Sequence, residues 1–235
     1  MTSLTPPYPY PTPNPTLIKT YNLEKHFEGG YFNQTVALES HPAASSTEDR
    51  LHPTTAEGRQ QSAWGPATTL LGENQVKDES PEKQGGRLDA TQIYYLLTTD
   101  SYRGKMHMNL HSHFHLLHQG RALYTLINPT TPPTIYRIVL GHDTSLGEVP
   151  QLYVPGGWWK ASEIPEEDRL LLDAPDAKEG LGKELKDSIG CLISEIVIPG
   201  WTPEQHVFLD EDKLKSMWAG KDGWQVYEKY LKSAP

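Results

Sequence analysis

The chain has 235 residues, of which 36% are hydrophobic and 22% charged, so it is long enough for one large domain with a packed core. Its 21 basic and 30 acidic side chains leave a formal charge of −9, which argues against nucleic acids and anionic membranes as partners. A single cysteine excludes an intrachain disulfide and a thiolate zinc cluster, and the N-terminus lacks a signal-peptide pattern, so we expect a cytoplasmic protein.

Three regions are expected along the chain. Residues 1–16 are interrupted by prolines, which predicts a flexible extended arm. Residues 17–209 are expected to form one domain, and residues 210–235 a C-terminal extension of two short helices that pack on it. Within the domain, residues 40–88 and 163–186 are polar and aperiodic, which is typical of irregular insertions or lids.

The rest of the domain consists of short runs rich in β-branched and aromatic residues, separated by glycine and proline turns. One strand is expected around residues 31–36. The others are expected at residues 91–98, 105–118, 122–128, 134–141, 151–155, 158–162 and 191–200. Many short strands at this spacing predict an all-β sandwich or barrel.

The strand expected at residues 105–118 carries most of the reactive side chains. Successive side chains of a strand point to opposite faces, and one face of this strand is polar while the other is mostly apolar. The polar face contains His107, Asn109, His111, His113 and His115. Imidazoles that converge in a cavity are suited to acid–base chemistry and metal binding near neutral pH. We therefore expect this face to line an interior pocket; the alternative is a solvated strand that happens to be rich in histidine.

Five segments occur in a characteristic order. They are HFEGGYF (26–32), IYYLL (93–97), the histidine-rich strand up to Gly120, LGHDTSLGEVPQLYVPGGWWKAS (140–162) and IVIPGW (196–201). Together they resemble the cupin-5 family, also called DUF985, a branch of the RmlC-like cupins. The resemblance implies an all-β double-stranded β-helix, the cupin jelly roll, with a pocket in the barrel mouth and a homodimeric assembly.

The resemblance also implies positions for metal ligands, and the chain departs from them. His107 keeps the first place, but Asn109, His113 and Lys160 replace the second histidine, the glutamate and the last histidine. We therefore favour a site without a cofactor. The alternative is a divalent transition metal held by His107, His111 and His113, although one straight strand would spread these ligands over roughly 20 Å at about 3.3 Å per residue.

We expect a small-molecule enzyme that catalyses a non-oxidative acid–base reaction on a small organic substrate in specialised metabolism. The reaction would be an isomerisation, cyclisation, epimerisation, dehydration or lyase reaction, with His107 and His113 as base and acid and Lys160 stabilising negative charge. The alternatives are a metal-dependent cupin oxygenase or decarboxylase and a non-catalytic cupin that binds a small ligand.

The expected substrate contacts are polar and aromatic residues of the matched segments. They are Glu28, Tyr31, Tyr94, Asn109, His111, His115, Gln151, Tyr153, Trp159 and Glu195. Glu195 lies among apolar neighbours, so its charge should be paired in the pocket or solvated. We expect His26 and His206 to be ordinary turn or surface residues, and Cys191 to be a buried structural thiol.

Overall fold

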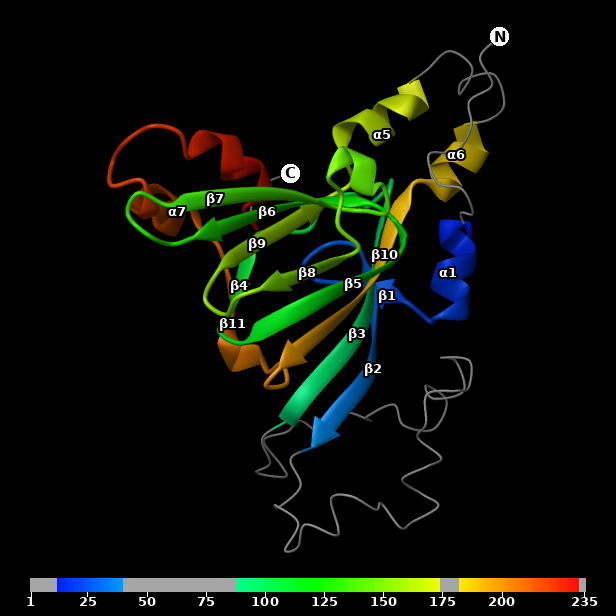
Figure 1. Ribbon diagram of the computed structural model, residues 1–235, viewed down its shortest axis with the longest axis horizontal. Coiled ribbons are helices and arrows are strands. Elements are labelled where there is room, and N and C mark those ends of the chain that lie inside the picture. Colours follow the sequence, from blue (N-terminus) through cyan, green and yellow to red (C-terminus); the bar gives the residue numbers. More distant parts are fainter. Residues whose placement is uncertain (1–11, 40–87, 174–181, 233–235) are drawn as a thin grey trace, which may run out of the picture.

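A computed structural model describes residues 12–39, 88–173 and 182–232 (Figure 1). Two antiparallel sheets form a jelly roll, which confirms the predicted double-stranded β-helix. The six-stranded sheet has the order β1-β2-β3-β10-β5-β8, and the five-stranded sheet has the order β11-β4-β9-β6-β7. In the part of the chain described, no helix has the length and apolar character needed to cross a membrane.

The strands of the six-stranded sheet are β1 (Glu24–Lys25), β2 (Tyr31–Glu39), β3 (Leu88–Thr98), β10 (Gly190–Ile198), β5 (Ser112–Gly120) and β8 (Gln151–Val154). Those of the five-stranded sheet are β11 (His206–Phe208), β4 (His107–Asn109), β9 (Trp159–Glu163), β6 (Ala122–Asn128) and β7 (Thr134–Leu140). The helical segments are α1 (Asn14–Thr20), η2 (Thr144–Leu146), α5 (Glu166–Leu170), η3 (Leu171–Asp173), α6 (Gly182–Ser188), η5 (Pro203–Gln205), α7 (Glu211–Met217) and η6 (Gln225–Tyr230).

The histidine-rich segment is not one strand, so that prediction is wrong. Leu110 and His111 carry the chain from β4 in the five-stranded sheet to β5 in the six-stranded sheet. The residues that face the interior remain an even number of positions apart across this connection. They therefore still point to the same side of the chain. The buried side chains of the two strands are His107, Asn109, His113 and His115. Because they come from two facing sheets, they converge instead of spreading along a line.

The insertions and the N-terminal arm are only partly described. Residues 40–87 of the first expected insertion, 174–181 of the second and 1–11 of the arm lie outside the described residues. The described remainder of the second insertion is not irregular as predicted, because it forms α5, η3 and α6. The arm prediction is also wrong from Asn14 onward, where α1 begins with a proline in its first turn, a position that tolerates proline.

Helices cover part of the outer face of each sheet. The C-terminal segments α7 and η6 bury Leu214, Met217 and Tyr230 against the five-stranded sheet, which confirms the two expected C-terminal helical segments (Figure 1). At the other face, Leu17 of α1 packs in a cluster with residues of the six-stranded sheet. Cys191 is buried in the barrel interior, as predicted.

Tyr230 fastens the C-terminal segment to the strand that carries Lys160. Its hydroxyl donates to the buried carboxylate of Glu163 at the end of β9 and lies 3.2 Å from Thr125 Oγ1. We predict that Tyr230→Phe lowers the free energy of unfolding by about 1–3 kcal/mol, because a buried carboxylate loses a donor. Urea unfolding measures the change.

Tyr227→Phe is the matched control, since Tyr227 is half-buried in the same segment and its hydroxyl makes no hydrogen bond among the described residues. Equal stability of the two variants would contradict the anchoring role of Tyr230.

Candidate functional site

Two cavities meet between the sheets, and Glu28 and Glu195 line both of them. The inner cavity measures about 10 Å³, roughly the room for one water molecule. The outer cavity measures about 260 Å³. Its apolar wall consists of Phe27, Phe32, Ile93, Val197 and Trp201. Its polar groups are His26, Glu28, Gln34, Thr91, Asn109 and Glu195.

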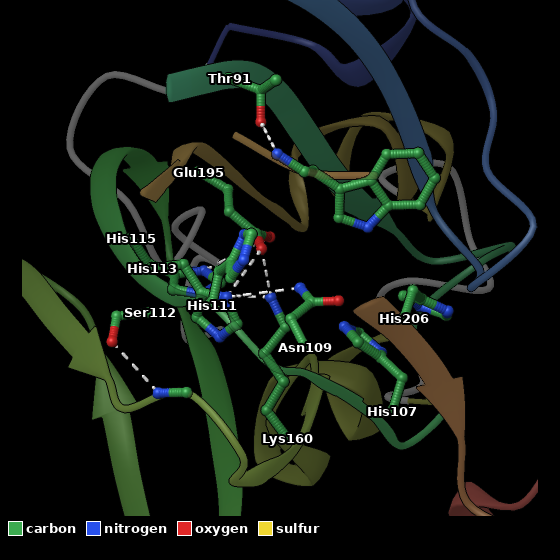
Figure 2. A network of polar contacts seen from close by, with 12 residues as sticks. Thr91, His107, Asn109, His111, Ser112, His113, His115, Lys160, Glu195 and His206 are labelled. Carbon is green, nitrogen blue, oxygen red and sulfur yellow. Dashed lines mark hydrogen bonds and ion pairs between the residues drawn. The ribbon is translucent and has the colours of Figure 1, made fainter. Parts of the chain in front are cut away.

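The first polar group of the site is built around Glu195. β10 places this carboxylate beside His115 of β5, and β9 sends Lys160 across from the opposite sheet. Lys160 Nζ donates to Glu195 Oε1 at 2.5 Å and lies 3.3 Å from His115 Nε2. His115 Nδ1 lies 3.1 Å from the hydroxyl of Tyr124. The result is a continuous buried chain of polar contacts from Tyr124 to Glu195, of which Figure 2 shows His115, Lys160 and Glu195.

The charges of this group follow from burial and from Lys160. Burial, the largest single effect, would raise the pKa of Glu195, but the charge and hydrogen bond of Lys160 together with His113 outweigh it, so the pKa lies below its usual value. Burial, reinforced by Lys160, holds the pKa values of His113 and His115 well below 6.5. At neutral pH the group is therefore a carboxylate–ammonium pair among neutral imidazoles.

His113 and Asn109 lie beside this pair. The Asn109 amide nitrogen is 3.3 Å from His113 Nδ1, which in turn lies 3.7 Å from Glu195 Oε1. Asn109 lines the outer cavity, whereas His113 lines neither cavity. His113 therefore supports Asn109 and Glu195 from behind and does not meet the cavity as the predicted acid would.

The second polar group is built around Glu28, which follows β1. His206 Nε2 donates to Glu28 Oε1 at 2.8 Å, and the Nε2 atom of His107 lies 3.4 Å from Oε2. The His107 and His206 rings stack with centroids 4.9 Å apart. Figure 2 shows these two rings on one side of Asn109 and the Glu195 group on the other.

Burial holds the pKa of His107 down at about 4, against the opposing effect of Glu28. Burial alone would raise the pKa of Glu28, but the neighbouring imidazoles outweigh it and lower the pKa. Glu28 is therefore ionised at neutral pH although it is buried, and a buried charge without a partner is costly.

Several predicted substrate contacts point away from the cavities because of strand alternation. Tyr31 and Tyr94 lie on the outer face of the six-stranded sheet, and their neighbours Phe32 and Tyr95 take the inward positions. Tyr31 donates its hydroxyl to Asp100. These two predictions are wrong by one residue each, since the next residue along the strand is the one that faces the interior.

The same rule corrects the predictions for β8 and β9. Gln151 and Tyr153 are exposed on the outer face. Trp159 is buried under the C-terminal helices, because its neighbour Lys160 occupies the inward position opposite His107. None of the three lines either cavity.

His111 is also wrongly placed by the prediction. It lies in the connection between the sheets, where its Nδ1 donates to the carbonyl oxygen of Pro199 at 2.9 Å. It therefore neither lines a cavity nor joins His107 and His113 in a cluster of metal-ligating atoms.

The residues that the sequence analysis missed or set aside include two tyrosines and two histidines of the site. Tyr95 and Tyr124 line the inner cavity, and burial raises the pKa of both phenols, which therefore stay neutral. His26 and His206 were expected at turns or on the surface, yet their side chains are only 7% and 6% exposed beside Glu28. The matched segment HFEGGYF already contained His26, but no sequence pattern pointed to His206.

The positions that hold a metal in related cupins do not fit one here. They correspond to His107, Asn109, His113 and Lys160. The ammonium of Lys160 already bonds Glu195, and a second cation beside it would be repelled. The Asn109 amide nitrogen faces the His113 ring nitrogen and carries no lone pair for a metal, so this residue offers only its neutral carbonyl oxygen in place of an imidazole. We derive no chemistry from a metal at these four positions.

Comparisons with known proteins agree with the fold. A sequence model of the family described as "Cupin superfamily (DUF985)" matches residues 15–209. The uncharacterized protein YML079W of Saccharomyces cerevisiae (strain ATCC 204508 / S288c) is 35% identical over 202 residues, which are 86% of this chain and 78% of the yeast protein.

Two solved structures are similar at 18% identity and support the fold alone. Protein SO0799 from Shewanella oneidensis has a TM-score of 0.59, and the match covers 95% of this chain and 99% of the Shewanella chain. A hypothetical protein from Leishmania major has a TM-score of 0.57, and the match covers 91% of this chain and 96% of the Leishmania chain.

The lowered imidazole pKa values predict that the folded protein is sensitive to acid. Below pH 6.5 the unfolded chain takes up protons on its histidines, while buried His113 and His115 stay neutral. The free energy of unfolding therefore falls as the pH drops below about 6.5, and the lowered pKa of Glu195 extends the loss below about pH 4.5. Urea unfolding of chelator-treated protein between about pH 7.5 and pH 4 measures this dependence.

The slope of the unfolding free energy against pH reports how many more protons the unfolded chain binds than the folded one. His113→Gln should reduce this number by up to about one proton. His142→Gln is the matched control, because His142 is exposed in the fold. An unchanged slope in His113→Gln would show that this ring is not held neutral by burial.

Proposed function

This chain belongs to the DUF985 family of the cupin superfamily, and we propose that it is a small-molecule enzyme that catalyses a non-oxidative proton transfer in the outer cavity. The reaction class is the isomerisation, epimerisation, cyclisation or dehydration of a small carbonyl compound. One observation carries the proposal: the ionised carboxylate of Glu195 lies at the boundary of an apolar cavity and is held by a buried lysine.

Glu195 is the proposed general base. Lys160 bonds only its Oε1 atom, and within the described residues Oε2 accepts no hydrogen bond. A carboxylate held on one oxygen keeps its orientation while the other oxygen can take a proton from a bound molecule. This role replaces the predicted pairing of His107 as base with His113 as acid.

Asn109 is the proposed donor to the substrate oxygen. Its side chain is 2% exposed and lines the outer cavity together with Glu195. One amide hydrogen faces His113, which leaves the second free for a carbonyl oxygen of a substrate. A fixed amide donor stabilises the negative charge that develops when the neighbouring carbon loses its proton.

Lys160, His113 and His115 are proposed as positioning residues, because they act through Glu195. When Glu195 takes a proton its charge is neutralised, and the Lys160 ammonium, which is bonded to Glu195, then balances the new negative charge on the substrate. The net charge of the chamber stays constant during the step. This matters for buried groups, where creating a new charge would be costly.

The walls of the outer cavity support a small substrate with an apolar body. Phe32, Ile93 and Trp201 offer aromatic and aliphatic contact, while polar groups cluster around the two carboxylates. A few oriented polar groups in an apolar pocket are typical of small-molecule sites. We therefore propose a cyclic or aromatic carbonyl compound with an acidic C–H bond.

We predict that the protein exchanges C–H protons of such compounds with solvent. Incubation in D₂O with a panel of small alicyclic ketones and 1,3-dicarbonyl compounds, followed by proton NMR, detects this exchange without knowledge of the final product. Glu195→Gln should reduce the exchange rate by about 10²–10⁴-fold, because the amide cannot accept the proton.

Glu24→Gln is the matched control, since Glu24 is exposed in β1 and should leave the exchange rate unchanged. Exchange that persists in Glu195→Gln would overturn the assigned base. Binding of panel compounds without any exchange would instead favour a binding protein.

We also propose that the chain forms a homodimer through the outer face of the six-stranded sheet. Phe114 and Tyr153 are 41% and 51% exposed there, with ring centroids 5.1 Å apart, and Ile198 on the neighbouring strand is 47% exposed. Grouped apolar side chains of this kind are typical of an interaction surface.

Light scattering after size-exclusion chromatography should give twice the chain mass for the wild type and a monomer for Phe114→Asp. Val226→Asp is the control, because Val226 is 64% exposed on η6, away from this face. A monomeric wild type would rule out the dimer.

A further inference from the structure

The surroundings of Glu28 differ from those of Glu195 in one respect. Both carboxylates are buried, with Glu28 8% and Glu195 7% exposed. Glu195 has the ammonium of Lys160 as its partner. Within residues 12–39, 88–173 and 182–232, no lysine or arginine forms an ion pair with Glu28, and the side chains in ion-pair distance of its carboxylate are all imidazoles.

Those imidazoles come from three separate parts of the fold. His26 precedes Glu28 in the same loop, His107 lies in β4, and His206 lies in β11, which pairs with β4. The ring nitrogens of His26 and His107 are 3.5 and 3.4 Å from Glu28 Oε2, and that of His206 is 2.8 Å from Oε1. A negative charge is thus enclosed by nitrogen atoms without a fixed cation.

The tautomer of His107 sharpens this observation. Its Nδ1 lies 2.8 Å from the carbonyl oxygen of Lys105, which can only accept, so Nδ1 carries the hydrogen and the neutral ring has its lone pair on Nε2. Nε2 is buried and has no hydrogen-bond partner in the described chain. Its lone pair faces a carboxylate oxygen at 3.4 Å, an arrangement that is repulsive unless a cation lies between them.

The spacing of the ligand atoms suits such a cation. Ligand atoms of Glu28, His107 and His206 all lie within 4.8 Å of one another. In a tetrahedral site with bonds of about 2.0–2.1 Å, neighbouring ligands are about 3.4 Å apart. The His107–Glu28 contact already has this length, and the His206–Glu28 hydrogen bond of 2.8 Å would have to lengthen.

We propose that Glu28, His107 and His206 bind a divalent transition metal, with His26 beside them as a further nitrogen donor. Two histidines and one carboxylate are a ligand set for Zn²⁺ and Fe²⁺ that leaves coordination positions open. The carbonyl of Lys105 acts as the outer partner that fixes the His107 ring. This site shares only His107 with the metal positions of related cupins.

The second cluster of possible ligands does not compete with this assignment. His113, His115 and Glu195 also lie within metal-binding distance of one another. Lys160 Nζ, however, bonds Glu195 and lies 3.3 Å from His115, so an ammonium already supplies the positive charge. The two carboxylates are therefore neutralised differently, one by a side chain and one by an ion. The proposal does not depend on the proposed proton transfer.

Full-length untagged protein, made metal-free with a chelator, is titrated with Zn²⁺ by calorimetry and with Co²⁺ by visible absorption. We expect one equivalent to bind. Affinity should fall by more than about 100-fold in Glu28→Gln and in His206→Phe, which exceeds the roughly 10–100-fold effect of losing an outer partner. His142→Phe, at an exposed histidine, should retain the affinity within about 3-fold.

Circular dichroism confirms that each variant is folded before titration, and His206→Phe keeps the test valid should Glu28→Gln not fold. Absence of stoichiometric binding in the wild type would overturn the site, as would undiminished binding in His206→Phe. Loss of binding in Glu195→Gln alone would place the metal in the other cluster. Because metal binding is measured without a substrate, this result is separate from the deuterium-exchange result.

Discussion

The site depends on the pairing of Lys160 with Glu195 across the interior of the barrel. Each residue comes from a different sheet, so their contact joins the two sheets at the depth of the cavities. A carboxylate or an ammonium left alone at this depth would be costly to bury, and removing either one would strand the other. The pair therefore fixes both the closure of the chamber and the orientation of the proposed base.

The same constraint explains why the chamber has two unlike halves. The position that carries the last metal ligand in related cupins is a lysine here, which brings its own positive charge and excludes a metal from that half. The half around Glu28 has no lysine or arginine in an ion pair among the residues described, and we propose that its imidazoles bind a metal there. The outer cavity touches both carboxylates, so a bound molecule would contact both halves at once.

Membership of the cupin superfamily accounts for the scaffold and leaves the chemistry to particular side chains. Sheet order, the inward alternation and the glutamate after β1 belong to segments that match the family. The neutral imidazoles of β5 and the lysine of β9 are what give this chamber its charge pattern.

The sequence by itself determined the jelly roll, the strands at residues 91–98, 122–128, 134–141, 151–155, 158–162 and 191–200, and the inward position of Lys160, because strand alternation and matched motifs are local properties. It did not determine where the histidine-rich segment breaks, since the even spacing of His107 and His113 looks the same in one strand or two. It also did not reveal His206, which joins Glu28 only because β11 pairs with β4. Such contacts link residues that are distant along the chain, and only the packing of the two sheets decides which of them meet.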